Sequence, residues 1–185
     1  MDSLVEQILA EITTCLHQAS GESLAQAGLM VEAAPRIFVC GIGRSGLCMR
    51  ALGMRLMQLG KTVFVVGETI TPSITAGDLL VIGSGSGRTA SLLVMAEQAR
   101  HHDAKILLFT TDTTSPLADL ADYRVIISAT SRKTAGGPHD HISAQPMGTL
   151  FEQSLLILCD CLILGLMQMP GVDVTQMQKW HANLE

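Results

Sequence analysis

The stretch Val81-Ile-Gly-Ser-Gly-Ser-Gly-Arg-Thr-Ala-Ser91, VIGSGSGRTAS, joins a short apolar run to a segment that predicts a helix. Its glycines allow backbone N–H groups to turn toward a ligand, and Ser84, Ser86 and Thr89 add three hydroxyl groups beside them. The positive end of the helix would point at the same place. The stretch therefore predicts an anion site between a strand and a helix, which is the repeating unit of an α/β fold.

The rest of the chain repeats this alternation of short apolar runs and helices. The runs are apolar on both faces, which is typical of parallel strands covered by helices on each side. Between the last two strands we expect only a turn rich in Thr, Asp, Ser and Pro. Helices are expected over 4–19, 23–34, 45–59, 89–101 and 147–168, and strands over 37–40, 62–66, 79–82, 105–110 and 123–127.

These elements predict an α/β protein with a single doubly wound domain over 1–185, about five parallel strands and helices on both faces. Residues 1–35 would form N-terminal helices, 36–130 the sheet core, and 147–169 a C-terminal helix that reaches the active site. In such a sheet ligands bind at the carboxyl ends of the strands, where the glycine-rich loops fall.

Composition narrows the class of protein. Hydrophobic residues make up 48% of the 185 residues, so surplus apolar surface is expected at subunit interfaces. The net charge of −5, without a basic run, disfavours nucleic acid. The acidic N-terminus is no signal peptide, and the apolar run 155–169 contains Asp160 and is too short to cross a membrane. We expect a cytoplasmic, self-associating protein whose five cysteines are reduced, with no membrane partner.

A second glycine-rich loop, Gly41-Ile-Gly43-Arg-Ser-Gly46, matches the G-x-G-x-x-G pattern of dinucleotide-binding folds. Glu68 follows about twenty residues later, where an acid would bind the ribose of NAD. Against NAD, little chain is left for a substrate domain, and the loop at 83–89 carries more hydroxyl groups than a pyrophosphate turn requires. ATP is disfavoured because Gly87-Arg88-Thr89 lacks the lysine of a P-loop.

One phosphate on a small metabolite is the remaining ligand. Ser45, at the start of the neighbouring helix, adds a fourth hydroxyl from an adjacent strand end. The alternative is that the serines merely cap helices, which accounts for one or two of them but not for the whole GSGSGRT run. The expected phosphate-binding residues are Ser45, Ser84, Gly85, Ser86, Gly87 and Thr89.

Three further motifs, MRLMQLG (54–60), VVGETITPSI (65–74) and QPMGTLFEQ (145–153), carry a family resemblance. The chain resembles the 6-phospho-3-hexuloisomerases, a family of sugar isomerase (SIS) domain proteins with a flavodoxin-like fold. The resemblance implies an intramolecular oxidoreductase that isomerises D-arabino-hex-3-ulose 6-phosphate to D-fructose 6-phosphate in the ribulose monophosphate pathway of formaldehyde assimilation. It also implies a homotetramer that needs neither nicotinamide nor a metal.

Other activities stay open within the same fold. One alternative is a different phosphosugar isomerase, for example one that acts on arabinose 5-phosphate. The other is a non-enzymatic sugar-phosphate-binding module, as SIS domains also form parts of regulators. Such regulators generally carry an added DNA-binding domain, and the chain has no basic recognition helix, which disfavours the second alternative.

The resemblance suggests catalytic roles for two glutamates. Isomerisation removes a proton from C2, passes through an enediol and returns a proton to C3, which a carboxylate can perform. Glu152, in QPMGTLFEQ near the start of an apolar helix, is the expected carbon base. The alternative is a glutamate that only stabilises the helix dipole. Glu68, in VGETITPSI, could contact sugar hydroxyls or move oxygen protons, or could only anchor a turn.

The sequence leaves several roles open. Arg88 stands where the family often has Glu, and could contact the phosphate or pair with a nearby carboxylate. The histidine that shuttles oxygen protons could be His17, His139 or His141. The run His139-Asp-His141 is more typical of a solvated loop, and a metal site there is disfavoured because no further ligand stands nearby. The other possible substrate contacts are Gly43, Arg44, Thr69 and Gln145.

Overall fold

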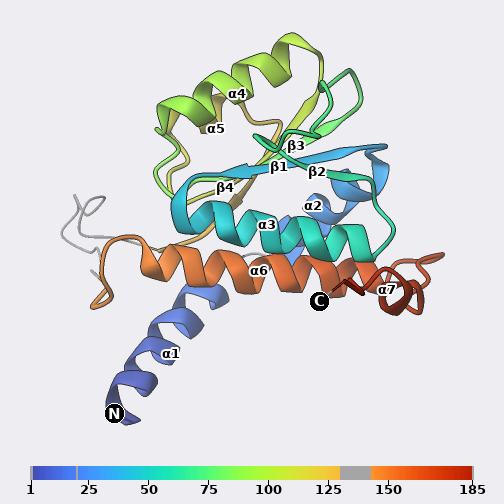
Figure 1. The fold of residues 1–185 in the computed structure, drawn as a ribbon. Coiled ribbons are helices and arrows are strands. Elements are labelled where there is room, and N and C mark those ends of the chain that lie inside the picture. The colour runs from blue at the N-terminus through green and yellow to red at the C-terminus, as the bar shows by residue number, and fades with distance from the viewer. Residues whose placement is uncertain (1, 20, 130–142, 185) are drawn as a thin grey trace.

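The computed structural model describes residues 2–19, 21–129 and 143–184 (Figure 1). A parallel five-stranded sheet with strand order β2-β1-β3-β4-β5 lies at its centre. The strands are β1 (Ile37–Gly41), β2 (Val63–Val65), β3 (Leu79–Gly83), β4 (Lys105–Thr110) and β5 (Tyr123–Ile126). The helices are α1 (Asp2–His17), α2 (Gly21–Ala33), α3 (Gly43–Gln58), α4 (Ala90–His101), α5 (Pro116–Leu120), α6 (Thr149–Met167) and α7 (Gln176–Lys179).

The strand order places the start of both glycine-rich loops side by side. From β1 the chain passes to β2 on one side and then returns to β3 on the other side of β1. Parallel pairing of β1 with β3 aligns Ile37 with Leu79 and ends with Gly41 opposite Gly83. A reversal of strand order of this kind opens a crevice beyond the carboxyl ends of the two strands. The fold therefore forms a ligand crevice between β1 and β3.

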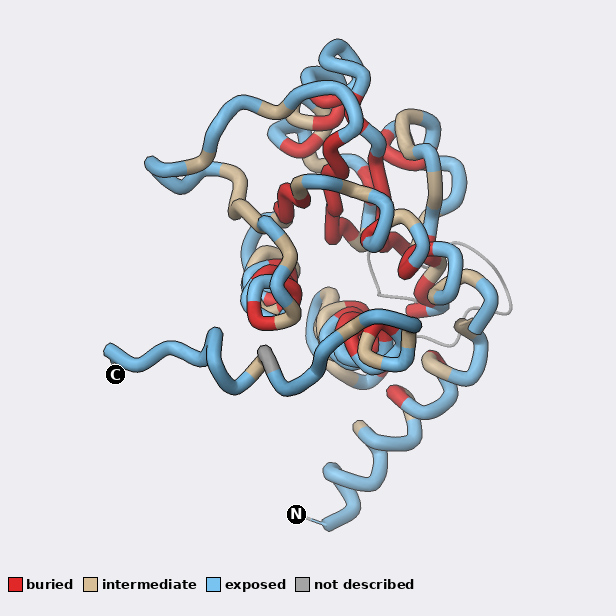
Figure 2. Tube along the Cα trace, turned by 90° about the vertical axis from the view of Figure 1, so that its right-hand side faces the viewer, coloured by how far each residue is buried: buried red, intermediate tan, exposed pale blue. Residues whose placement is uncertain are grey.

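Helices cover both faces of the sheet, as the continuous apolar strands predict (Figure 1). On one face α2, α3 and α6 pack against side chains that include Ile37, Val39 and Leu79. On the other face α4 and α5 pack against the alternate residues of the same strands, among them Phe38 and Leu80. Figure 2 shows the buried residues concentrated in this centre. The α/β fold with a doubly wound parallel sheet is thus confirmed.

Helix α1 is an exception to this packing. It projects away from the sheet, and only Ile12 and Cys15 on it are buried (Figure 2). Leu4, Val5 and Leu9 on its outer part are 53–62% exposed. The outer half of α1 therefore has little support from the rest of the described chain.

The expected element boundaries agree with the structure to within one residue for each strand and two for each longer helix. The turn expected between the last two strands is wrong in part, because α5 forms there. Ser115 caps α5 by accepting a hydrogen bond from the backbone N–H of Ala118 (3.3 Å), and Pro116 occupies the first helical position. The sequence analysis also missed the short helix α7. Both are short helices without hydrophobic periodicity.

The length criterion used against a membrane span is wrong for α6. The helix begins at Thr149, not within the apolar run, and its 19 residues make it long and apolar enough to cross a membrane by length and composition alone. Leu155 and Leu158 on α6 are nevertheless buried in the core with α1, α2 and α3. Core helices of folded proteins pass the same test, so α6 is weak support for a membrane span.

Candidate phosphosugar site

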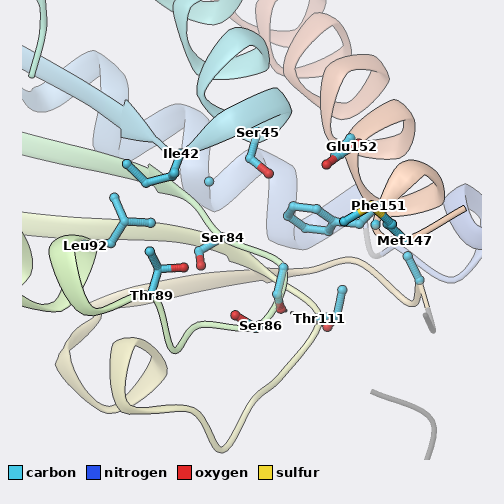
Figure 3. Close-up of a pocket in the computed structure, with 14 residues that line it drawn as sticks. Ile42, Ser45, Ser84, Ser86, Thr89, Leu92, Thr111, Met147, Phe151 and Glu152 are labelled. Carbon is cyan, nitrogen blue, oxygen red and sulfur yellow. Dashed lines mark hydrogen bonds between the residues drawn. The ribbon is translucent and has the colours of Figure 1, made fainter. Parts of the chain in front are cut away.

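A pocket of about 550 Å³ opens beyond the carboxyl ends of β1 and β3 (Figure 3). Most of its lining comes from the segments that follow β1 and β3 and from the start of α6, and Thr111 and Ala129, which follow β4 and β5, complete it. Six of the sequence-predicted site residues line it: Ser45, Ser84, Gly85, Ser86, Thr89 and Glu152. The other lining residues, which the sequence analysis did not single out, are Ile42, Gly83, Leu92, Thr111, Ala129, Met147, Gly148 and Phe151. Met147, Gly148 and Phe151 nevertheless stand in the motif QPMGTLFEQ, so that motif was the signal that could have found them.

The hydroxyl groups of the loop after β3 retain protons to donate. Ser84 is only 5% exposed, and its Oγ accepts a hydrogen bond from the backbone N–H of Gly87 (3.2 Å). The Oγ of Ser86 accepts from the backbone N–H of Arg88 (3.3 Å). Because each hydroxyl is used as an acceptor, its own O–H proton stays available for an anion.

The N-termini of α3 and α4 both reach the pocket without a side-chain cap. Thr89 is the N-cap residue of α4, but its side chain makes no capping hydrogen bond. The N-cap residue of α3 is Ile42, so Ser45 does not cap that helix either. Helix capping therefore does not account for Thr89 or Ser45. Ser84 and Thr89 both line the pocket, and Figure 3 shows them on the side away from Glu152.

The backbone of the loop is fixed to its neighbours. The carbonyl oxygen of Gly85 accepts hydrogen bonds from the side chains of Thr110 (3.0 Å) and Thr111 (2.9 Å). Gly87 adopts a φ of +61°, and a Cβ there would lie 2.0 Å from the Oγ of Ser115. Gly87 itself does not line the pocket, so its role is to form the turn.

Glu152 lies in the first turn of α6, across the pocket from Ser84 and Thr89 (Figure 3). Its Oε2 pairs with the Nε of Arg44 at 2.5 Å, and its side chain is 18% exposed. The thiol of Cys48 donates a hydrogen bond to the Glu152 backbone carbonyl (3.3 Å). Burial, and then the charge of Glu152, raise the pKa of Cys48, which keeps the thiol protonated. Two predicted site residues, Arg44 and Glu152, thus meet in one ion pair.

Other predicted site residues lie outside the pocket lining of this chain. Glu68 is half-exposed and pairs with Arg50, its Oε1 2.5 Å from Nη1. Thr69 beside it is exposed. Gly43 has a φ of +61°, and a Cβ added there would have no atom within 4 Å.

Arg88 and Gln145 are engaged elsewhere. Arg88 pairs with Asp112 (Nη2 to Oδ2, 2.9 Å), which is the second of the two roles considered for it. The side-chain amide of Gln145 donates to Glu11 of α1 (3.1 Å). Neither residue lines the pocket.

The histidines do not complete the site within the described residues. His17 is exposed on α1. His139 and His141 lie outside the described residues. Within the part of the chain that the structure describes, no group of three or more His, Cys, Asp or Glu side chains is placed to hold a metal ion.

The glycine spacing of the first loop has a packing explanation. A Cβ at Gly46 would lie 2.5 Å from the carbonyl oxygen of Gly41, and a Cβ at Gly41 would lie 3.1 Å from the carbonyl oxygen of Gly83. Glycine at these positions lets α3 start close against the ends of β1 and β3. The G-x-G-x-x-G pattern is thus explained without a dinucleotide.

Sheet order and pocket together define a class of protein. A parallel α/β sheet whose switch point holds a pocket with convergent hydroxyl groups at a helix N-terminus is a phosphate-ligand-binding fold. The family model described as the SIS domain matches residues 30–155. The chain belongs to the SIS domain family, within the group that includes the 3-hexulose-6-phosphate isomerases.

Relatives agree over nearly the whole chain. The 3-hexulose-6-phosphate isomerase of Mycobacterium gastri is 42% identical, and the match covers 95% of this chain and 86% of that protein. The Bacillus subtilis (strain 168) protein of the same name is 38% identical, with 98% and 97% covered. A crystal structure from Methanococcus jannaschii, described as inferring a molecular function of 3-hexulose-6-phosphate isomerase, is 30% identical with a TM-score of 0.81 and covers 99% of both chains. These relatives support a phosphosugar isomerase function.

Proposed function

We propose that the protein isomerises D-arabino-hex-3-ulose 6-phosphate to D-fructose 6-phosphate. One observation carries the proposal: a single pocket has a carboxylate, Glu152, on one side and the hydroxyl groups of Ser84, Ser86 and Thr89 on the other. The hydroxyl groups and the N-terminus of α4 would bind the phosphate. The sugar would then extend toward Glu152. The identity of 42% to a 3-hexulose-6-phosphate isomerase adds support.

The reaction needs one carbon base and two oxygen proton transfers. Glu152 takes the proton from C2, the electrons of the C–H bond form the C2=C3 double bond, and the C3 carbonyl oxygen gains a proton to give the enediol. The C2 hydroxyl then loses its proton and becomes a carbonyl, while C3 takes the proton from the Glu152 carboxyl group. Atoms and electrons balance without an external oxidant. General acid–base catalysis of this kind contributes roughly 10²- to 10⁴-fold in rate.

Arg44 supports the base in this scheme. Its guanidinium, paired with one carboxylate oxygen of Glu152, holds the carboxylate in one orientation and leaves the other oxygen for the substrate. Negative charge develops on the substrate oxygens as the C2 proton leaves. The guanidinium of Arg44, whose side chain is 62% exposed beside the pocket, can stabilise that charge as well.

The wider setting follows the family. The chain would act as a single SIS domain, without nicotinamide or metal, in the cytoplasm and in the ribulose monophosphate pathway. The family resemblance implies a homotetramer, and Leu4, Val5 and Leu9 leave an apolar face on α1 that another copy could cover. Sedimentation analysis of the purified protein would measure the assembly. A monomer at micromolar concentration would contradict it.

A coupled assay tests the reaction. Hexulose 6-phosphate is supplied, and fructose 6-phosphate is followed through phosphoglucose isomerase and glucose 6-phosphate dehydrogenase. The wild type should turn over the substrate, and Glu152→Gln should lose about 10³-fold in kcat because an amide cannot accept the proton. Asp160→Asn, an exposed acid on the same helix, is the matched control and should keep full activity. Full activity of Glu152→Gln would remove Glu152 as the base but leave the reaction.

The same samples separate the alternatives. Turnover of arabinose 5-phosphate but not of the hexulose would assign a different phosphosugar isomerase. Tight binding of fructose 6-phosphate without any turnover would assign a binding module. Tight binding of NAD in a calorimetric titration would restore the dinucleotide alternative.

A further inference from the structure

The carboxylate of Glu11, on α1, binds the segment that leads into α6. It accepts hydrogen bonds from the Oγ of Ser143 (2.5 Å), the backbone N–H of Ala144 (2.9 Å) and the side-chain amide of Gln145 (3.1 Å). The Oγ of Ser143 in turn accepts from the backbone N–H of Gln145 (3.0 Å). Burial works against the charged form of Glu11, but these hydrogen bonds lower its pKa below the ordinary value. A charged carboxylate therefore fixes three consecutive residues.

The segment after these residues forms part of the pocket. Met147 and Gly148 both line the pocket, and Gly148 is the N-cap residue of α6. Met147 adopts a φ of +54°, a left-handed conformation that is unfavourable for a non-glycine residue and persists only where its surroundings impose it. Its side chain is 73% exposed, so burial does not impose that conformation. The backbone on either side must do so.

Hydrogen bonds hold both ends of this strained turn. On the C-terminal side, the backbone N–H and the Oγ1 of Thr149 both donate to the carbonyl oxygen of Pro146 (3.1 and 2.6 Å). On the N-terminal side, the segment is held by the three hydrogen bonds to Glu11. Glu11 comes from α1, a helix with no residue in the pocket lining, so it acts on the pocket only through this segment.

The helix that carries Glu152 is held independently of Glu11. Leu150, Phe151 and Leu155 are all less than 9% exposed and anchor the start of α6 in the core. Loss of the Glu11 contacts would thus release the N-terminal side of the turn that holds Met147 and Gly148, without moving the helix of the base.

We propose that Glu11 is a positioning residue that holds Met147 and Gly148 as a wall of the pocket, so that the substrate binds to a preformed surface. The proposal rests on the proposed function, because it concerns binding of the same phosphosugar. In this proposal Glu11 supports substrate binding, whereas Glu152 carries out the proton transfer.

Steady-state kinetics test this division. Glu11→Gln should raise KM about 5- to 10-fold, the size of effect expected when hydrogen bonds to a charged group are weakened, while kcat stays within about twofold. Glu6→Gln, an exposed glutamate on the same helix, is the matched control and should change neither. Ser143→Ala should also raise KM, and the double variant should raise KM by less than the product of the two single effects, because the hydrogen bond between Ser143 and Glu11 is common to both.

Amide hydrogen exchange gives a readout that does not depend on turnover. In Glu11→Gln, exchange should quicken at residues 144–149 and stay unchanged elsewhere. Unchanged exchange there would overturn the proposal, as would a fall in kcat at constant KM, or faster exchange over the whole chain with a lower Tm. If the wild type does not turn over the hexulose, the proposed function fails, and the exchange rates alone then decide whether Glu11 holds this segment.

Discussion

Two glycine-rich loops look alike in the sequence but do different work in the structure. We call residues 41–46 the first loop and residues 83–89 the second loop. In the first loop Gly41 and Gly46 allow close packing, since a Cβ at Gly46 would lie 2.5 Å from the Gly41 carbonyl oxygen. In the second loop three hydroxyl groups, those of Ser84, Ser86 and Thr89, line the pocket. Glycine spacing alone therefore does not identify a ligand, whereas the side chains between the glycines do.

The prediction with the largest expected effect distinguishes two costs of replacing a glycine: strain in the backbone and clashes of the added Cβ with its neighbours. Gly43 in the first loop and Gly87 in the second loop share a φ of +61°, but a Cβ at 43 meets open space and a Cβ at 87 would lie 2.0 Å from the Oγ of Ser115. Gly43→Ala should cost about 1 kcal/mol of unfolding free energy, from conformational strain. Gly87→Ala should cost more than about 3 kcal/mol, because strain and overpacking combine. Urea denaturation measures both.

The double variant Gly87→Ala with Ser115→Gly is the control for this comparison. It removes the atom that the new Cβ would contact, at the expense of the α5 cap. If contact with Ser115 causes the loss, Ser115→Gly should lower the free energy of unfolding less in the Gly87→Ala variant than it does in the wild type. Equal losses for Gly43→Ala and Gly87→Ala would contradict the comparison.

A second difference between the loops is the partner of their arginines. Arg44 pairs with Glu152 in the pocket, whereas Arg88 pairs with Asp112 outside the pocket lining. In the proposed reaction, Arg44→Gln should lower kcat about 10- to 30-fold, because the carboxylate loses its fixed orientation and the developing charge loses a cation. Arg88→Gln should stay within about twofold. Initial rates over a range of substrate concentrations measure both, and a larger loss for Arg88→Gln would reverse the assignment of the two loops.

Much of the fold could be predicted from the sequence because its signal is local. The strands are apolar on both faces and the loops between them are rich in glycine, so β1 and β3 are evident from residues such as Val39 and Val81. Helix α5 was missed because it is too short for periodicity, although Ser115-Pro116 carried a start signal.

The site was predictable only in part. Ser84 and Glu152 stand in recognisable motifs, and Met147 shares the motif of Glu152 but has an apolar side chain that gave no sign of lining a pocket. Thr111 lines the pocket through tertiary packing that no sequence spacing encodes. For the same reason the contact of Gln145 with Glu11, 134 residues away in the chain, could not be foreseen.

A third prediction tests whether the second loop binds phosphate. Thr89→Val removes a hydroxyl but keeps the side-chain shape, and no capping hydrogen bond is lost because Thr89 makes none. KM should rise about 5- to 10-fold and inhibition by inorganic phosphate should weaken by the same factor, since one hydrogen bond to a charged group is lost. Thr113→Val, an exposed threonine outside the pocket lining, is the control. Unchanged phosphate inhibition in Thr89→Val would place the phosphate elsewhere.

The smallest expected effect concerns Asp112, the carboxylate that pairs with Arg88 of the second loop. Hydrogen bonds from the backbone N–H and hydroxyl of Thr114, and then from Arg88, lower the pKa of Asp112 below its ordinary 3.8. A lowered pKa in the folded state means that the ionised form stabilises the fold above pH 3.8, and that this stabilisation is lost as the pH falls below that value.

Asp112→Asn should therefore cost up to about 1 kcal/mol of unfolding free energy at pH 7, and the difference from wild type should shrink steadily below pH 4. Urea denaturation at several pH values measures it, with Asp119→Asn on α5 as the control. A difference that stays constant down to pH 3 would show that the shape of the Asp112 side chain, and not its charge, supports the second loop.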